Sequence, residues 1–171
     1  MRPIILIVAL FFAGGPAAAQ SWKEYTYPTD FFSVAFPADP KVETTIYQAV
    51  DGRSVEARLY SVSQEGGMFR MTVADLTDPT MQENAVLDHA VSTLSQGSEI
   101  KVDIPHRISR VYGRQLSIAA PDGSYSSVAV FYHKQRLYQI EGTVLPGDTN
   151  TTSDAIRFQQ SLAFTDDSTN R

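Results

Sequence analysis

Cysteine is absent from the 171-residue chain, and histidine occurs only three times. A chain without cysteine forms no disulfide and lacks the thiolate required for thiol catalysis or for a thiolate metal site. His89, His106 and His133 do not have the H-x-x-x-H or H-E-x-x-H spacing that places two histidines around zinc. We therefore interpret the three histidines as surface or packing residues, and we expect no cofactor.

Motifs of other catalytic classes are missing as well. The sequence contains no G-x-S-x-G nucleophile elbow. Its glycine pairs, Gly14-Gly15 and Gly66-Gly67, fit a break in the amino-terminal segment and a turn, rather than a phosphate-binding loop. Lysine and arginine number 14 against 19 acids, and they form no basic run, which argues against a nucleic-acid partner.

Residues 1–19 have the pattern of a signal peptide. Arg2 supplies a short basic region, residues 4–13 are apolar but too few to span a bilayer, and the alanines at 17–19 form a small-residue cleavage site. We expect a mature chain that starts at Gln20 and has no stable membrane insertion; an uncleaved anchor is the alternative. Because no cysteine follows the apolar segment, a lipoprotein anchor is excluded, and we expect a periplasmic or secreted location.

Residues 20–165 are expected to form one globular domain, followed by a polar tail at 166–171. Short apolar runs separated by proline, glycine and aspartate turns predict a meander of antiparallel strands. The last two long strands form a hairpin between Tyr125 and Val144, joined by the polar residues His133–Arg136. Earlier strands are predicted at 21–27, 31–36, 41–50, 53–63, 68–76, 101–108 and 111–119.

Two segments change to helical spacing. The first begins either with an Asp78 cap or with a Thr80–Glu83 capping box, and it stops at Gly97. The second has Thr152 or Ser153 as its predicted cap and closes over the hairpin. Their apolar stripes are Leu87, Ala90, Val91 and Leu94 in the first helix, and Ala155, Phe158 and Leu162 in the second.

The hairpin decides the expected fold class. From Val128 to Tyr132 the side chains are apolar on both faces of the strand, so both faces need cover. We therefore predict an α+β fold in which a central antiparallel β-sheet has helices on both faces. One face of the return strand, with Gln139 and Glu141, is mostly polar, which indicates thinner cover or a place nearer an edge. Gly142 indicates a bulge or the close approach of a helix.

A series of core and turn residues runs along the chain in a recognisable order. They are Trp22, Tyr25, FFSVAFP at Phe31–Pro37, Pro40, Val42, Asp75, Gly113-Arg114, Asp122-Gly123, Leu137-Tyr138 and RFQQSL at Arg157–Leu162. Together with the midchain helix, this order resembles the PsbP-like family, named for an extrinsic protein of photosystem II, whose fold also occurs in a small Ran-binding nuclear import factor. The resemblance implies an α/β/α sandwich that acts as a binding or accessory module, and it transfers no photosystem role.

Two groups of residues are candidate binding sites. Five aromatic residues gather near the start of the domain and are candidates to line a groove for a ligand or peptide; closing one end of the core is the alternative. Three acids flank a strand-to-helix junction, where their oxygens are candidate ligands for a cation such as Ca²⁺; capping and turn solvation is the alternative. The aromatic residues are Trp22, Tyr25, Tyr27, Phe31 and Phe32, and the acids are Asp75, Asp78 and Glu83.

A complete fold pattern without a catalytic set favours a binding protein over an enzyme. The sequence therefore predicts an exported, non-catalytic binding or accessory module that interacts with another protein of the cell envelope, which the sequence does not identify. The alternatives are an envelope hydrolase and a small-molecule or metal-binding protein. A pocket that joins a histidine, an acid and a serine favours the hydrolase, whereas an exposed apolar surface favours the protein partner.

Overall fold

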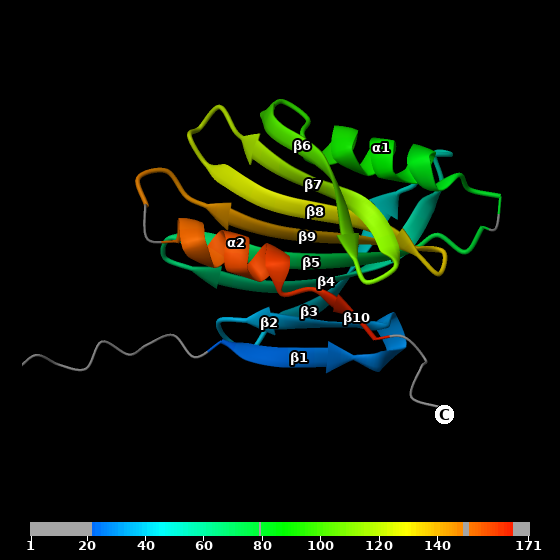
Figure 1. Cartoon of the computed structure of the whole chain (residues 1–171), viewed down its shortest axis with the longest axis horizontal. Helices are drawn as coiled ribbons and strands as arrows, with labels where there is room; N and C mark the ends of the chain where they lie inside the picture. The colour runs from blue at the N-terminus through cyan, green and yellow to red at the C-terminus, as the bar shows by residue number, and fades with distance from the viewer. Residues whose placement is uncertain (1–21, 79, 149–150, 166–171) are drawn as a thin grey trace, which may run out of the picture.

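The computed structural model describes residues 22–78, 80–148 and 151–165 (Figure 1). The predicted signal peptide at 1–19 and the predicted tail at 166–171 lie outside the described residues. The elements in chain order are β1 (Lys23–Tyr27), η1 (Pro28–Asp30), β2 (Phe32–Phe36), β3 (Lys41–Gln48), β4 (Ser54–Gln64), β5 (Gly67–Asp75), α1 (Glu83–Leu94), β6 (Glu99–Ile108), β7 (Val111–Ala119), β8 (Tyr125–His133), β9 (Arg136–Val144), α2 (Thr152–Gln160) and β10 (Ala163–Phe164). Within these residues, no helix has the length and apolar character needed to cross a membrane.

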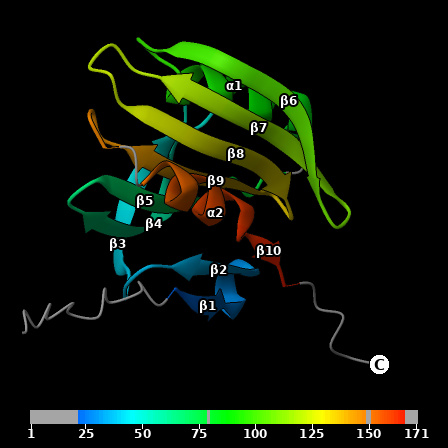
Figure 2. The same cartoon turned by 60° about the vertical axis from the view of Figure 1, so that its left-hand side comes forward.

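Most of the chain is antiparallel β-sheet, in two separate sheets. The larger sheet has the order β3-β4-β5-β9-β8-β7-β6, so the predicted hairpin, β8 and β9, lies in its interior. The smaller sheet has the order β1-β2-β10 and lies beneath the larger one, where the chain returns from α2 (Figure 2). The prediction of a single central sheet missed this second sheet, because β2 pairs with β10 across most of the chain length.

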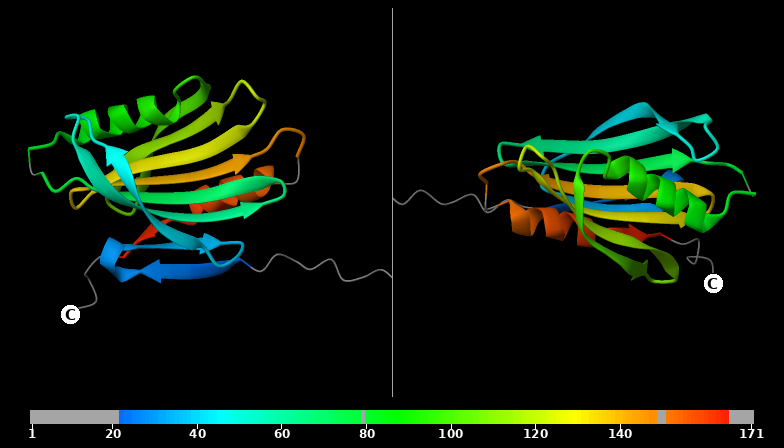
Figure 3. Two further views of the ribbon diagram at one scale, coloured as in Figure 1. Left: turned by 180° about the vertical axis from the view of Figure 1, so that it is seen from behind. Right: turned by 90° about the horizontal axis from the view of Figure 1, so that it is seen from above.

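Two hydrophobic clusters hold the elements together. In the first, Phe158 and Leu162 pack with Ala129 and Phe131 of β8 and with residues of β2. In the second, four buried residues of α1 (Val86, Leu87, Ala90 and Val91) pack with Val128 and Val130 of β8. Figure 3 shows α1 lying across the larger sheet when the molecule is seen from behind. The predicted stripe is confirmed for Leu87, Ala90 and Val91, whereas Leu94 is only partly buried.

Both predicted starts of α1 are wrong. The helix begins at Glu83 after Gln82, whose side chain makes no capping hydrogen bond. Asp78 instead accepts hydrogen bonds from the backbone N and the Oγ1 of Thr80, at 2.8 and 2.7 Å. The carboxylate oxygen of Asp78 is therefore used in a local turn and not, as predicted, in capping the helix. The predicted cap of the second helix is also wrong: Thr152 is already its first residue, and the cap position belongs to Thr151, whose side chain makes no capping hydrogen bond.

The polar face of β9 marks thin cover rather than an edge, since β9 is the middle strand of the larger sheet. On its other face, Gly142 lies against α2. A Cβ atom added at Gly142 would stand only 2.6 Å from the Cα of Ala155 and 2.7 Å from its carbonyl oxygen. Because backbone atoms cannot move aside as a flexible side chain does, only glycine fits there. Of the two predictions for Gly142, the close approach of a helix is confirmed.

Candidate functional site

The five N-terminal aromatic residues do not form one open groove. Phe32 is fully buried, while Trp22, Tyr25 and Tyr27 are partly buried and pack against the first hydrophobic cluster. Phe31 has a left-handed backbone (φ 56°), and its ring lies beneath the cationic groups of Lys134 and Arg136, at 4.4 and 4.9 Å. The structure therefore favours the alternative interpretation, in which these rings close one end of the core.

The three acids proposed as cation ligands do not come together. Asp75 accepts hydrogen bonds from the backbone N and the Oγ1 of Thr77, and Asp78 is paired with Arg53 at 3.2 Å. Glu83 stands in the first turn of α1. Across residues 22–78, 80–148 and 151–165, no group of three histidine, cysteine, aspartate or glutamate residues could hold a metal ion. The metal-site prediction is therefore wrong for the described chain, because turns and arginine already occupy two of the carboxylates.

The histidines occupy packing positions. His89 Nε2 lies 2.9 Å from the carbonyl oxygen of Gln48, which joins α1 to the end of β3. His106 packs against the ring of Phe131, and burial lowers the pKa of its imidazole below the usual value. The ring of His133 packs against Phe164. These contacts support the interpretation of the histidines as packing residues.

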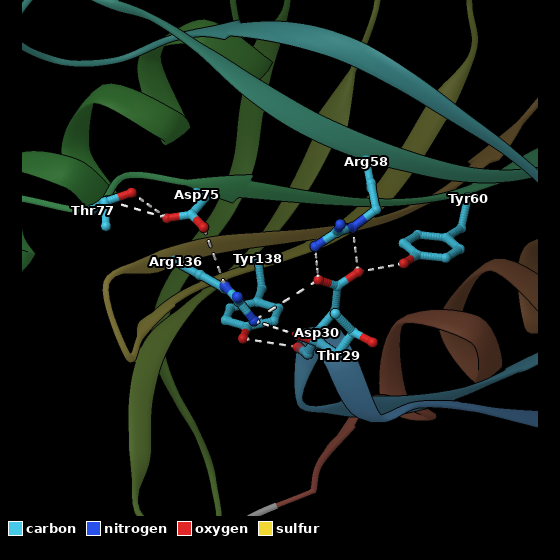
Figure 4. Close-up of polar contacts among 8 residues, drawn as sticks. All are labelled: Thr29, Asp30, Arg58, Tyr60, Asp75, Thr77, Arg136 and Tyr138. Carbon is cyan, nitrogen blue, oxygen red and sulfur yellow. Dashed lines mark hydrogen bonds and ion pairs between the residues drawn. The ribbon is translucent and has the colours of Figure 1, made fainter.

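Asp30 is the centre of a polar cluster that the sequence did not predict. Asp30, at the end of η1, is 1% exposed, and its carboxylate accepts a two-pronged hydrogen bond from Arg58 and another from the hydroxyl of Tyr60 (Figure 4). Arg58 and Tyr60 come from β4, in the other sheet. A buried carboxylate is stable only when charge and hydrogen bonds compensate its desolvation, and these two side chains supply both.

Arg136 and Tyr138 of β9 complete the cluster from a second strand. Arg136 Nη1 donates to the carbonyl oxygen of Thr29 at 2.7 Å and lies 3.8 Å from the Asp30 carboxylate. The hydroxyl of Tyr138 donates to the carbonyl oxygen of Asp30 at 3.0 Å. Figure 4 shows that side chains from both β4 and β9 contact η1. We call Asp30, Arg58, Tyr60, Arg136 and Tyr138 the Asp30 cluster.

The electrostatics of the cluster are those of a closed network. The hydrogen bond from Arg58 to Asp30 raises the pKa of the guanidinium. Burial raises the pKa of the Tyr138 hydroxyl to about 12, and burial together with the bond to Asp30 raises that of Tyr60. The Arg58 guanidinium and the hydroxyls of Tyr60 and Tyr138 therefore keep their protons around neutral pH.

A hollow of about 370 Å³ opens beside the Asp30 cluster. Its walls include both arginines of the cluster together with Glu56, Asp75 and Thr77. Arg136 Nε lies 3.9 Å from the Asp75 carboxylate, and Arg58 is held by Asp30. Because both guanidinium groups already face acids, the hollow is not a strong receptor for a further anion. The cluster is better explained as a structural contact that holds the two sheets together.

The outer strands of the larger sheet form a different kind of surface. β3 and β6 stand at its two edges, so each has one side that is not paired with a strand of the described chain. Every residue of β3 except Tyr47 is exposed, including Val42 at 51% and Ile46 at 62%. β6 is also largely exposed and carries Ile100, Val102 and Ile104. Both strands are predicted from the sequence, but their places at the edges follow from the order of the whole sheet.

The two edges differ in regularity. β3 pairs with β4 over all eight of its residues without a register shift. β6 has a register shift between Ile100 and Val102 and contains Pro105 in mid-strand. Bulges and proline are the devices by which natural proteins protect an edge from pairing with another strand. The edge of β6 is therefore blunted, whereas the edge of β3 is left open.

Comparison with known proteins identifies the fold. No protein-family model and no curated protein sequence matches the chain. The chain is similar to the solution structure of cyanobacterial PsbP from Synechocystis sp. PCC 6803, with a TM-score of 0.57 and 12% sequence identity over 88% of this chain and 96% of that one. It also matches a protein of unknown function from Pseudomonas aeruginosa, a putative regulator, with a TM-score of 0.42 and 11% identity over 79% and 90% of the two chains. The first similarity shows that the chain has the PsbP-like fold that its sequence predicted.

Proposed function

We propose that the chain is an exported, non-catalytic binding module that takes up an extended segment of an envelope protein along the edge of β3. The observation that carries this proposal is the open edge of β3, an unbroken strand with exposed apolar side chains. An extended segment that adds to such an edge gains a row of backbone hydrogen bonds, while alternate side chains give specificity. The hydrolase alternative lacks comparable support, because the histidine contacts described above are packing contacts.

The chemistry of β3 defines the partner segment. Lys41 and Glu43 pair with each other at 2.8 Å, so the strand presents little net charge. Its middle, Thr44–Ile46, is uncharged and rich in residues that favour β-structure. The segment that fits is therefore an uncharged, β-forming stretch with an apolar residue at alternate positions, placed to face Val42 and Ile46.

The edge of β3 is left uncovered by the arrangement of the layers. We infer that the fold is a sandwich with one helix on each face of the larger sheet. Side chains of a strand alternate between its faces. The cluster containing α1 includes Val128 and Val130, whereas the cluster containing α2 includes Ala129 and Phe131. Both helices pack mainly on β8 and β9, in the middle of the sheet. The end of β3 meets a helix, where Tyr47 packs against His89.

Export is tested by determining the amino end of the chain recovered from the producing cell. We expect mass analysis of periplasmic or secreted material to find Gln20, or a close neighbour, as the first residue, because the small residues at 17–19 suit signal peptidase. Recovery of the chain in the membrane fraction with Met1 intact would contradict export. It would leave the proposal for the β3 edge unchanged.

Partner binding is tested with a photo-crosslinking residue introduced at Thr44 of β3 in the full chain, in its producing cell. We expect one heteromeric adduct whose crosslink maps to an extended, uncharged segment. A synthetic peptide of that segment should bind the purified protein. The variant Ile46→Lys places a charge on the edge at an exposed site, and we expect it to weaken peptide binding by about tenfold or more without changing the thermal midpoint.

The matched control is the blunted edge. A crosslinker at Ile104 should give no such adduct, and Ile104→Lys, at a similarly exposed position of β6, should leave peptide binding unchanged. Adducts that form at Ile104 instead of Thr44, or that contain only two copies of this chain, would overturn the proposal. Equal effects of Ile46→Lys and Ile104→Lys would do the same.

A further inference from the structure

A second hollow lies on the larger sheet beside the carboxyl-terminal end of α1. It measures about 210 Å³ and is separate from the hollow at the Asp30 cluster. Residues from four strands and one helix line it: Thr45, Leu59, Arg70, Thr72, Leu94, Gln139 and Glu141. This is the face of β9 whose polar side chains indicated thin cover. Because α1 ends at Leu94, the sheet beyond the helix is left open.

Gln139, which lines this hollow, has a side-chain amide nitrogen without a hydrogen-bond partner in the described chain. Gln139 is only 8% exposed, and its Nε2 has no hydrogen-bond partner within the described parts of the chain. A buried donor without a partner is costly, so such groups are rare in folded proteins and call for an explanation. The last torsion of a glutamine side chain has a broad energy minimum, so a small rotation can turn the amide toward an occupant of the hollow.

The charges around Gln139 decide what kind of occupant fits. Arg70 Nη2 donates to Glu141 Oε2 at 2.7 Å, and Glu141 Oε1 accepts from the hydroxyls of Ser126 and Thr143 at 3.1 and 3.3 Å. The one arginine and one glutamate of the lining therefore neutralise each other, and much of the acceptor capacity of Glu141 is already used. What remains is uncharged hydrogen-bonding capacity, from the Gln139 amide and the threonine hydroxyls, between the apolar walls of Leu59 and Leu94.

We propose that this hollow binds a small neutral amide, whose carbonyl oxygen accepts a hydrogen bond from Gln139 Nε2 and whose aliphatic part lies between Leu59 and Leu94. A carboxylate has the same shape but would lose its hydration without gaining an unpaired cation, because Arg70 is held by Glu141. The hollow suits a group the size of an asparagine or glutamine side chain. This site does not depend on the β3 edge, so either proposal can fail without the other.

The test is a titration of the isotopically labelled full chain, followed by NMR, with two probes of equal size. Propionamide is expected to shift the side-chain NH₂ signals of Gln139 in a saturable way, and sodium propionate is expected to bind at least about tenfold more weakly. Gln139→Met keeps the length of the side chain but removes the donor. It should abolish the saturable shifts of neighbouring signals such as Thr72, while the thermal midpoint stays the same or rises because an unpaired polar group is gone.

The matched control is Gln115→Met. Gln115 lies opposite Ala129, on the other face of the sheet, so its replacement should leave the propionamide titration unchanged. Equal binding of propionate, shifts that survive Gln139→Met, or no saturable shift would each overturn the proposal. A capped peptide with one central glutamine is the second arm. Binding tighter than that of propionamide assigns the amide to a protein side chain, whereas binding of propionamide alone assigns it to a free small molecule.

Discussion

Replacing Asp30 with alanine is expected to lower the free energy of unfolding by about 3–5 kcal/mol, since removing one partner of a buried ion pair leaves the others uncompensated. The change removes the acceptor for Arg58 and for the buried hydroxyl of Tyr60. The Arg58 side chain is 35% exposed and can recover some hydration, which places the expected loss nearer the lower end. The backbone contacts of Arg136 and Tyr138 with Thr29 and Asp30 remain possible.

Denaturant unfolding of single variants measures this effect. Asp39→Ala is the control, because Asp39 is an exposed acid near the same sheet that accepts a hydrogen bond from Tyr25. It should cost less than about 1 kcal/mol, as exposed pairs usually do. Asp30→Asn keeps the shape and should fall between the two. If Asp30→Ala and Asp39→Ala unfold at the same denaturant concentration, the Asp30 cluster does not fasten the two sheets.

A double-mutant cycle separates the pair from its surroundings. Arg58→Ala alone leaves Asp30 buried with fewer donors, so it should also be strongly destabilising. The double variant Asp30→Ala with Arg58→Ala should be more stable than the sum of the two single losses predicts, because neither partner remains unpaired. Additive losses would show that the two side chains act independently, against the geometry of Figure 4.

Features encoded by local periodicity could be predicted from the sequence. The alternation of apolar residues in β8, the helical spacing of Ala155 and Phe158, and the close approach at Gly142 depend on a few neighbouring residues each. Features that join distant segments could not. β10 completes the smaller sheet with only two residues, Ala163 and Phe164, and no local pattern states which strand such a short piece joins.

The candidate sites show the same division between local features, which could be predicted, and long-range contacts, which could not. Asp30 was part of a predicted turn, which is correct locally, since η1 spans Pro28–Asp30. Its partners Arg58 and Arg136 are 28 and 106 positions further along the chain, so nothing near Asp30 signals a buried ion pair. The β3 strand was predicted, but its place at an edge follows from the order of the whole sheet. The unpaired amide nitrogen of Gln139 could not be predicted either, because its surroundings depend on where α1 ends.

The second large effect concerns α2, which the sequence predicted to close over the hairpin. Phe158 is fully buried, and its ring lies between those of Phe36 and Phe69, with centroids 4.9 and 5.4 Å away. These rings come from β2 and β5, so Phe158 joins both sheets to the helix. Truncation to alanine removes buried apolar surface and leaves a cavity among aromatic rings that cannot easily collapse, so Phe158→Ala should cost about 3–5 kcal/mol.

The neighbouring residue Arg157 supplies the matched control for Phe158→Ala. Its side chain is exposed, and its guanidinium lies 4.6 Å from the ring centroid of Trp22. A partly exposed cation–π contact contributes about 0.5–1 kcal/mol, so Arg157→Ala should lower the unfolding midpoint only slightly. Phe158→Ala should lower it strongly with an unchanged denaturant dependence, because the folded state is weakened but not made less compact. If both variants unfold with the parent midpoint, α2 does not close the core, and the packing of the smaller sheet against it must be revised.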